Sequence, residues 1–412
     1  MVKNLTINDY TQKNIITHLE ITEKLLKKIA SKLSGKEKTA KIYAMPDLGI
    51  AQNVTRMLGG FYTGACYTWD TDMPFIPVDA TINVCGTAIY KLNKNISNEE
   101  FLIRLNNVLN NRKSYLDFAN TYLPQEVLST IDINDSSKYY WNYTNGNHFI
   151  VFAESDGEYG LEKGQYMIVH ASAIEFKKDN LKYGLYPVKG NWYYDDIKTE
   201  YDEESNRYLR YITGEKAKRF YNISSYLKKF NKIRNQYFCS AVLGDLLEKE
   251  IINTSHYGMP TINSVCIGCQ WEPLDYTLLT APGNDIFLVH PNTSSNNTFK
   301  FDDTKLTLTP HGCGVKMNNS KDSIEYIDQE NIKIGNNIFK IGDSVNIGVD
   351  VSIRTKNMQD SDLDKYILSI LTQCPGTIYG RLKQLYAKTK YGDFDYVAED
   401  HLIKSKNLSY KI

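Results

Sequence analysis

One histidine lies in a segment that allows a large group to come close, Thr309-Pro310-His311-Gly312-Cys313-Gly314. The two glycines leave the His311 imidazole on a tightly turning backbone with little side-chain bulk beside it. Such a position suits a nucleophile that a nucleotide phosphate must approach. His-Gly-x-Gly also occurs by chance, and a loop histidine is most often structural, so this motif alone leaves both interpretations open.

Other residues with metal-binding side chains support a chemical interpretation. The chain has only seven histidines, and His148, His170 and His256 each fall at an expected strand end or glycine-flanked turn. Cys85 lies in an apolar segment that reads as a buried strand. Imidazole and thiolate together suit zinc or another transition metal, and a thiolate can bridge two cations. For any one of these residues alone, a buried structural role is the simpler interpretation.

The elements that must position these side chains alternate between strands and helices. Hydrophobic periodicity, capping residues and turn residues predict strands at 41–45, 81–90, 148–152, 165–170, 265–270 and 285–290. They also predict helices at 11–34, from the Ser97–Glu100 capping box onward, 215–250, 361–373 and 377–390. There is no internal repeat, so we expect one composite α+β domain, with a core at 1–320 and a divergent C-terminal part at 321–412.

Composition restricts the classes of function. Apolar residues make up 42% of the 412 positions, enough for a sizeable core, and the formal net charge is zero. A neutral chain argues against a strongly electrostatic nucleic-acid binder, although a local basic face stays open. No apolar run approaches about 18 residues, so we expect no membrane span and a cytoplasmic protein. Its cysteines are then expected to be thiols rather than disulfides.

Seven short motifs occur in the order found in the RtcB family, which consists of GTP- and manganese-dependent RNA ligases. The chain resembles that family over residues 10–320, and its Gly-Asn-His-Phe motif matches intact. The motifs are Ala44-Met45-Pro46-Asp47, Asn83-Val84-Cys85-Gly86, Gly146-Asn147-His148-Phe149, Val169-His170-Ala171-Ser172, Ser255-His256-Tyr257, Ala281-Pro282-Gly283 and Pro310-His311-Gly312-Cys313-Gly314.

The resemblance implies a fold, a reaction and roles for individual residues. It implies a single domain with buried mixed or antiparallel sheets around a central metal site. That site would hold one or two Mn²⁺ ions on Cys85, His148, His170 and His256, and His311 would become guanylylated by GTP. The implied partner is RNA with 3′-phosphate and 5′-hydroxyl ends, and an activating protein is left open. The implied nucleotide contacts are Asn147, Phe149, Gly312, Gly314 and Asn284.

Several positions depart from the family pattern. Ile82 stands where the family has an aspartate three residues before the metal cysteine, Val151 replaces an acidic residue, and Val315 replaces an arginine. The family's lysine that reads the nucleotide cannot be placed, and its only candidates are Lys383, Lys388 and Lys390. We favour a divergent RNA ligase, because an inactive protein has no chemical need for His311. The alternative is an inactive RtcB-like protein that binds RNA ends or regulates another protein.

A third hypothesis concerns Cys266 and Cys269, which form a Cys-x-x-Cys motif that could hold structural zinc. No second Cys-x-x-Cys completes four ligands. The pair also lies in a predicted strand, where alternation would point the two side chains differently. Both observations argue against this hypothesis.

Overall fold

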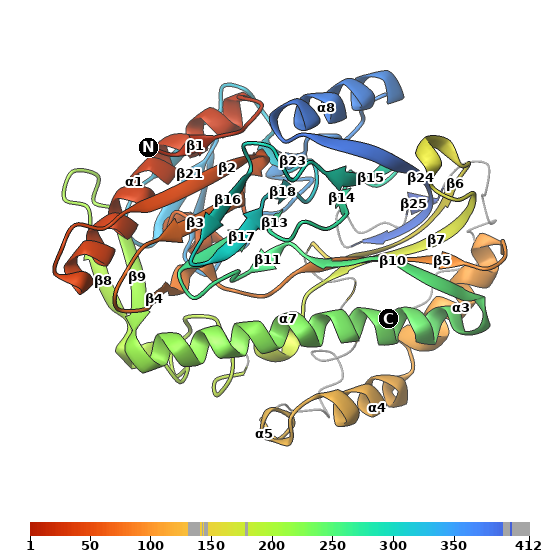
Figure 1. Cartoon of the computed structure of the whole chain (residues 1–412), viewed down its shortest axis with the longest axis horizontal. Coiled ribbons are helices and arrows are strands. Elements are labelled where there is room, and N and C mark those ends of the chain that lie inside the picture. Colours follow the sequence, from red (N-terminus) through yellow and green to blue (C-terminus); the bar gives the residue numbers. More distant parts are fainter. Residues whose placement is uncertain (131–140, 142, 144–146, 178–179, 390–395, 398–412) are drawn as a thin grey trace.

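The body of the molecule consists of two β-sheets with helices on their outer faces (Figure 1). A computed structural model describes residues 1–130, 141, 143, 147–177, 180–389 and 396–397. Helix α7 (Gly214–Leu243) runs along one side, beneath the strands of the larger sheet, and α1 (Tyr10–Ser34) covers the smaller sheet. The expectation of a mixed α+β fold is confirmed.

The smaller sheet has five strands, and β1 pairs in parallel with β2 while the other neighbours are antiparallel. Helix α1 packs on this sheet, and it confirms the helix predicted at 11–34. Asp9 and Gln12 form a capping box at the start of this helix, and Gly35 ends it in the left-handed conformation. In sheet order the strands are β1 (Lys3–Asn4), β2 (Ala40–Gly49), β3 (Thr63–Trp69), β12 (Ser264–Ile267) and β11 (Tyr257–Gly258).

The larger sheet is antiparallel throughout. Its central strands carry apolar residues on both faces. Helix α7 packs against one face, and residues on the other face, such as Ile89 and Val151, share a cluster with Leu288 of the same sheet. In sheet order the strands are β10 (Leu247–Ser255), β5 (Gly86–Leu92), β7 (Gly164–Ala171), β6 (Phe149–Ser155), β24 (Gly376–Thr389), β15 (Ile286–Pro291) and β14 (Tyr276–Leu278), and β25 (Tyr396–Val397) pairs with β24.

Shorter elements surround the sheets. The helices are α2 (Val54–Leu58), α3 (Asn98–Leu109), α4 (Arg112–Tyr122), α5 (Gln125–Leu128) and α8 (Asp360–Gln373), together with the 3₁₀ turns η1 (Val78–Ala80), η2 (Glu158–Gly160), η3 (Ile174–Phe176), η4 (Tyr194–Asp196) and η5 (Gly244–Leu246). The strands are β4 (Phe75–Pro77), β8 (Lys198–Tyr201), β9 (Tyr208–Thr213), β13 (Cys269–Gln270), β16 (Thr298–Phe301), β17 (Thr304–Thr307), β18 (Thr309–Pro310), β19 (Val315–Met317), β20 (Ile324–Tyr326), β21 (Asn331–Ile334), β22 (Asn337–Lys340) and β23 (Val351–Ile353).

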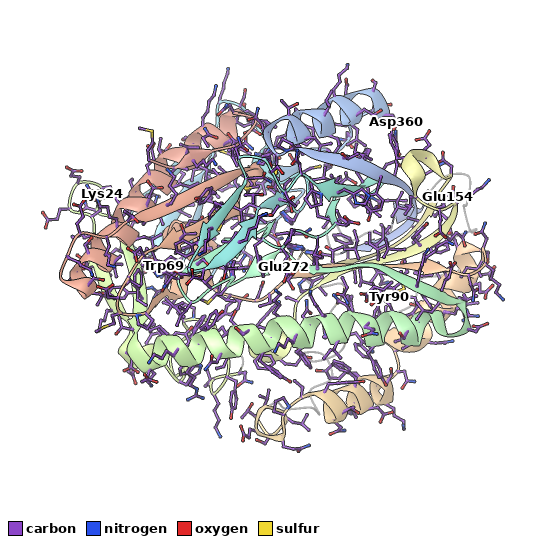
Figure 2. The ribbon with its side chains drawn as sticks, in the orientation of Figure 1. Lys24, Trp69, Tyr90, Glu154, Glu272 and Asp360 are labelled. Atoms are coloured by element: carbon purple, nitrogen blue, oxygen red, sulfur yellow. The ribbon has the colours of Figure 1, made fainter. Side chains whose placement is uncertain are left out.

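One apolar cluster runs through both sheets and includes Ile42 of β2 and Phe152 of β6. Trp69 and Tyr90 lie inside the fold, whereas Lys24 and Asp360 stand at its outer edges (Figure 2). No helix in the described ranges is long and apolar enough to span a membrane.

Four predicted elements were wrong in type or extent. The predicted helix 377–390 is strand β24, because pairing with β6 and β15 overrides the helix propensity of its leucines and lysines. The predicted helix 215–250 ends at Leu243, and the strand β10 follows it. The predicted strand 81–90 begins only at Gly86, and the strand 265–270 is interrupted at Gly268.

Candidate metal centre

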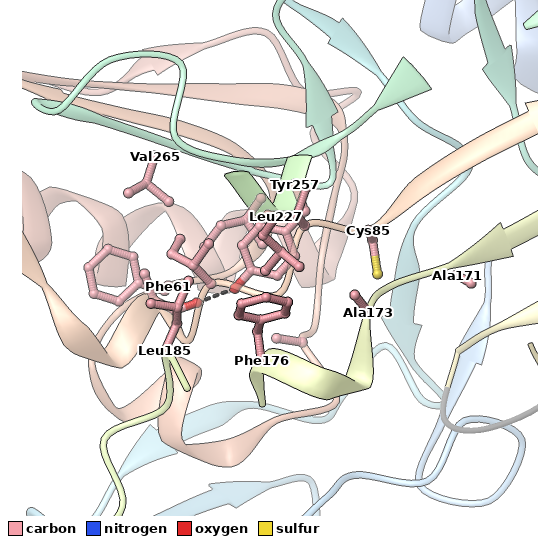
Figure 3. Packing of buried hydrophobic residues seen from close by; sticks show 14 of the residues in the cluster. Phe61, Cys85, Ala171, Ala173, Phe176, Leu185, Leu227, Tyr257 and Val265 are labelled. Atoms are coloured by element: carbon pink, nitrogen blue, oxygen red, sulfur yellow. Dashed lines mark hydrogen bonds between the residues drawn. The ribbon is translucent and has the colours of Figure 1, made fainter. Parts of the chain in front are cut away.

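Cys85 is presented by an irregular loop between η1 and β5. Thr81 and Val84 adopt φ angles of 43° and 49°, a conformation that β-branched residues rarely adopt. The Tyr257 hydroxyl donates to the Thr81 carbonyl over 3.1 Å and holds the loop in place. Figure 3 shows the Cys85 thiol at the edge of the apolar packing around Phe176 and Tyr257. The loop therefore fixes a buried thiol at the end of a central strand.

Three buried side chains from distant segments converge here. The potential ligand atoms of Cys85, His170 and His256 all lie within 4.8 Å of one another, and the two histidine Nε2 atoms are 3.0 Å apart. His170 Nδ1 lies 2.9 Å from the Asn147 carbonyl, which can only accept, so this nitrogen carries the proton. In the neutral ring Nε2 then presents a lone pair to the group. This cluster could bind a metal ion.

His148 borders the same group. Its Nε2 atom lies 3.8 Å from Cys85 Sγ and 3.0 Å from Ser172 Oγ. The ring of Phe149 lies 5.0 Å from that of His170, centroid to centroid. The structure therefore brings three of the four predicted ligands, Cys85, His170 and His256, into one group, and places His148 beside Cys85 at the edge of that group.

Burial keeps the side chains of the metal-ligand group uncharged in the absence of a metal. Burial lowers the pKa of His170 to about 3, with a contribution from nearby His311, and burial likewise lowers the pKa of His256. Burial raises the pKa of the Cys85 thiol. Both imidazoles are therefore neutral near pH 7, the form that binds metals, and Cys85 would release its proton on binding. His256 Nδ1 is buried without a hydrogen-bond partner among the described residues.

His311 lies beside this group and is held by a buried carboxylate. Asp47, which is 0% exposed, accepts hydrogen bonds through one oxygen, Oδ2, from the His311 backbone N–H at 3.1 Å and from Nδ1 at 2.6 Å. The ring centroid of His311 is 4.8 Å from that of His256. With Nδ1 occupied by Asp47, Nε2 is the ring nitrogen left to react.

Gly268 gives the His311 ring its space. Its φ of +61° interrupts the strand, and a Cβ at this position would lie 2.8 Å from His311 Cε1. The interruption also makes the alternation argument about Cys266 and Cys269 wrong, because both thiols face Cys66. In the described part of the chain, however, these thiols belong to no group of three ligands within 4.8 Å of one another. The zinc hypothesis gains no support.

A cavity of about 880 Å³ joins His311 to the metal-ligand group. Four of the five predicted nucleotide contacts line this cavity: Asn147, Phe149, Gly312 and Gly314. Asn284 does not line it, and its side-chain amide donates to the Met358 carbonyl at 3.2 Å.

Other candidate residues are placed differently. Lys383 and Lys388 do not line the cavity, whereas Gln384 of the same strand does. Asp79, the acidic residue nearest to Cys85 in the preceding sequence, binds Arg210 through both carboxylate oxygens. Gly146 and Lys390 lie outside the described residues.

Sequence reasoning missed several residues of the cavity. It assigned no role to Asp47, although the motif around that residue was recognised, and it did not indicate Arg56, Lys177, Arg210 or Gln384. No family model matches the chain, and no curated protein matches it. Functional interpretation therefore depends on the motifs and on this geometry.

Proposed function

We propose that this chain is a divergent RtcB-like RNA ligase that joins RNA 3′-phosphate or 2′,3′-cyclic phosphate ends to 5′-hydroxyl ends. The observation that carries the proposal is the position of His311. Buried Asp47 occupies its Nδ1, and its ring borders a cavity shared with Cys85, His170 and His256. A histidine held in one tautomer beside a metal-ligand group is suited to nucleophilic attack on a phosphate.

The chemistry follows from this arrangement. His311 Nε2 attacks the α-phosphorus of GTP, and the bond to pyrophosphate breaks. Where the end is a 2′,3′-cyclic phosphate, water first opens the bond between phosphorus and O2′ and leaves a 3′-phosphate. An oxygen of the RNA 3′-phosphate then attacks the phosphorus of the GMP, and the bond to the histidine nitrogen breaks. A 5′-hydroxyl oxygen then attacks the 3′-phosphorus, and GMP leaves.

Asp47 holds the proton on His311 Nδ1 throughout the first step and stabilises the positive charge that develops on the ring. Cys85, His148, His170 and His256 would hold manganese, which would neutralise phosphate charge when bound.

A second candidate function has its own support. Val151 and Val315 both line the cavity, where the resemblance implies an acidic residue and an arginine. Loss of these polar groups favours a protein that binds RNA ends without joining them. In this second candidate the cavity still binds RNA ends, but the protein does not join them.

A ligation assay separates the two candidates. Oligoribonucleotides with 3′-phosphate and 5′-hydroxyl ends are incubated with the protein, GTP and Mn²⁺, and joined RNA is measured on a denaturing gel. His311→Ala should abolish joining, while His290→Ala, a change in a half-exposed histidine on β15, should leave it unchanged. Binding of the 3′-phosphate strand without any joining by the unaltered protein would favour the second candidate.

A further inference from the structure

Arg56 is a buried cation with no acidic partner in the described part of the chain. Its side chain is 9% exposed and lines the cavity from helix α2. Nε donates to Thr81 Oγ1 at 2.6 Å, Nη2 donates to the Thr81 carbonyl at 3.3 Å, and the guanidinium lies 4.4 Å from the Tyr257 ring centroid. Among the described residues no carboxylate lies within 4.0 Å, and Nη1 donates to no protein group. A buried guanidinium that lacks a counter-charge is costly unless a ligand supplies one.

Lys177 is a second cation on the same cavity. It is half-buried, and its side-chain ammonium forms no hydrogen bond or ion pair with any residue that the structure describes. The positive charges of Lys177 and Arg56 both act on the Cys85 thiol and oppose the rise in its pKa caused by burial. Both side chains line the same cavity as Cys85, His170 and His256.

The remaining charged groups around the cavity do not neutralise this pair. Arg210 also lines the cavity, but Asp79 holds its guanidinium through Nε and Nη2. The acidic residue in the described lining is Asp343, which is exposed and accepts a hydrogen bond from the Lys340 backbone N–H at 2.7 Å. Two positive charges are thus left for a ligand.

We propose that Arg56 and Lys177 form a phosphate-binding subsite beside the Cys85 group. The free edge of a guanidinium and a flexible ammonium together match the several oxygens and double negative charge of a phosphate. The cavity of about 880 Å³ has room for the nucleotide or RNA terminus that carries the phosphate. Which of these carriers binds rests on the proposed function, whereas phosphate binding itself does not. Neither residue belongs to the seven motifs.

Equilibrium binding with two probes tests the subsite. Fluorescence anisotropy measures a short labelled RNA that ends in a 3′-phosphate against the same RNA with a 3′-hydroxyl, and calorimetry measures GTP. The variants are Lys177→Met and Arg56→Met, with Lys182→Met, an exposed lysine outside the cavity, as the matched control. Loss of one charge-assisted contact should weaken binding of the phosphate probe about tenfold or more, with the control unchanged.

Each outcome decides the question. A loss confined to the 3′-phosphate RNA assigns the subsite to the RNA end, and a loss confined to GTP assigns it to the nucleotide. Unchanged affinity for both probes in Lys177→Met overturns the subsite, even if Arg56→Met fails to fold, because the Lys177 ammonium has no hydrogen bond or ion pair with the described residues to lose. If binding depends on Lys177 but His311 takes no covalent GMP, the ligase proposal is wrong and the subsite is supported. If His311 is labelled normally but Lys177→Met binds both probes as tightly as the unaltered protein, the subsite is wrong and the ligase proposal is supported.

Discussion

Replacement of Asp47 by asparagine should slow the guanylylation of His311. The asparagine carbonyl oxygen can keep both hydrogen bonds that Asp47 Oδ2 accepts, and its amide can occupy the place of Oδ1, which has no partner among the described residues. Asp47→Asn therefore removes mainly the negative charge. A charge-assisted hydrogen bond exceeds a neutral one by about 1–1.5 kcal/mol, which corresponds to about a tenfold lower rate. Asp47→Ala removes the contact altogether and should cost about 100-fold, or near 3 kcal/mol.

The assay is single-turnover formation of covalent GMP from α-labelled GTP with Mn²⁺. Asp275→Asn is the matched control, because Asp275 makes the same 2.6 Å contact with Nδ1 of His290 at the surface. This control should label at the unaltered rate. An Asp47→Asn variant that folds normally and labels as fast as the unaltered protein would refute the role given to Asp47.

Three further predictions concern metal binding, backbone strain and pH. After dialysis, elemental analysis should find about tenfold less bound manganese or zinc in Cys85→Ser than in the unaltered protein. His311→Ala should keep its bound metal. Gly314→Ala should lower the free energy of unfolding by about 1–3 kcal/mol, and with it the thermal midpoint, because φ is +70° and a Cβ would collide with the Asp47 carbonyl; an unchanged midpoint contradicts this. Burial lowers the pKa of His18 to about 3, so the unfolded chain binds more protons between pH 3 and 6.5. Stability should therefore fall below pH 6.5, by about 2 kcal/mol at pH 5, in denaturant melts, and His18→Asn should lack this share.

Local patterns in the sequence predicted part of the fold. Apolar periodicity and the stop at Gly35 predicted helix α1, and apolar periodicity located α8 at Asp360–Gln373. The type of strand β24 could not be predicted in this way, because its leucines and lysines favour a helix. Pairing with β6 and β15, more than 80 residues away in the chain, decides its conformation.

The sequence predicted the residues of the candidate site that their type and local position identify. It did not predict the residues whose role depends on contacts between distant parts of the chain. Histidines at strand ends located His148 and His170, since strand ends meet at a sheet edge. The contact between Asp47 and His311 joins residues 264 positions apart, which no local pattern specifies. Arg56 could not be recognised for a related reason, because its importance comes from the absence of a nearby carboxylate among the residues that the structure describes.

The most direct test of the central claim is covalent labelling of the chain. The purified protein is incubated with α-labelled GTP and Mn²⁺, denatured, and separated by electrophoresis, with His311→Ala and His290→Ala in parallel. Label on the unaltered protein and on His290→Ala, and none on His311→Ala, is the predicted result. Label that persists in His311→Ala would contradict the account, as would a folded, unaltered protein that takes no label with manganese, zinc or cobalt.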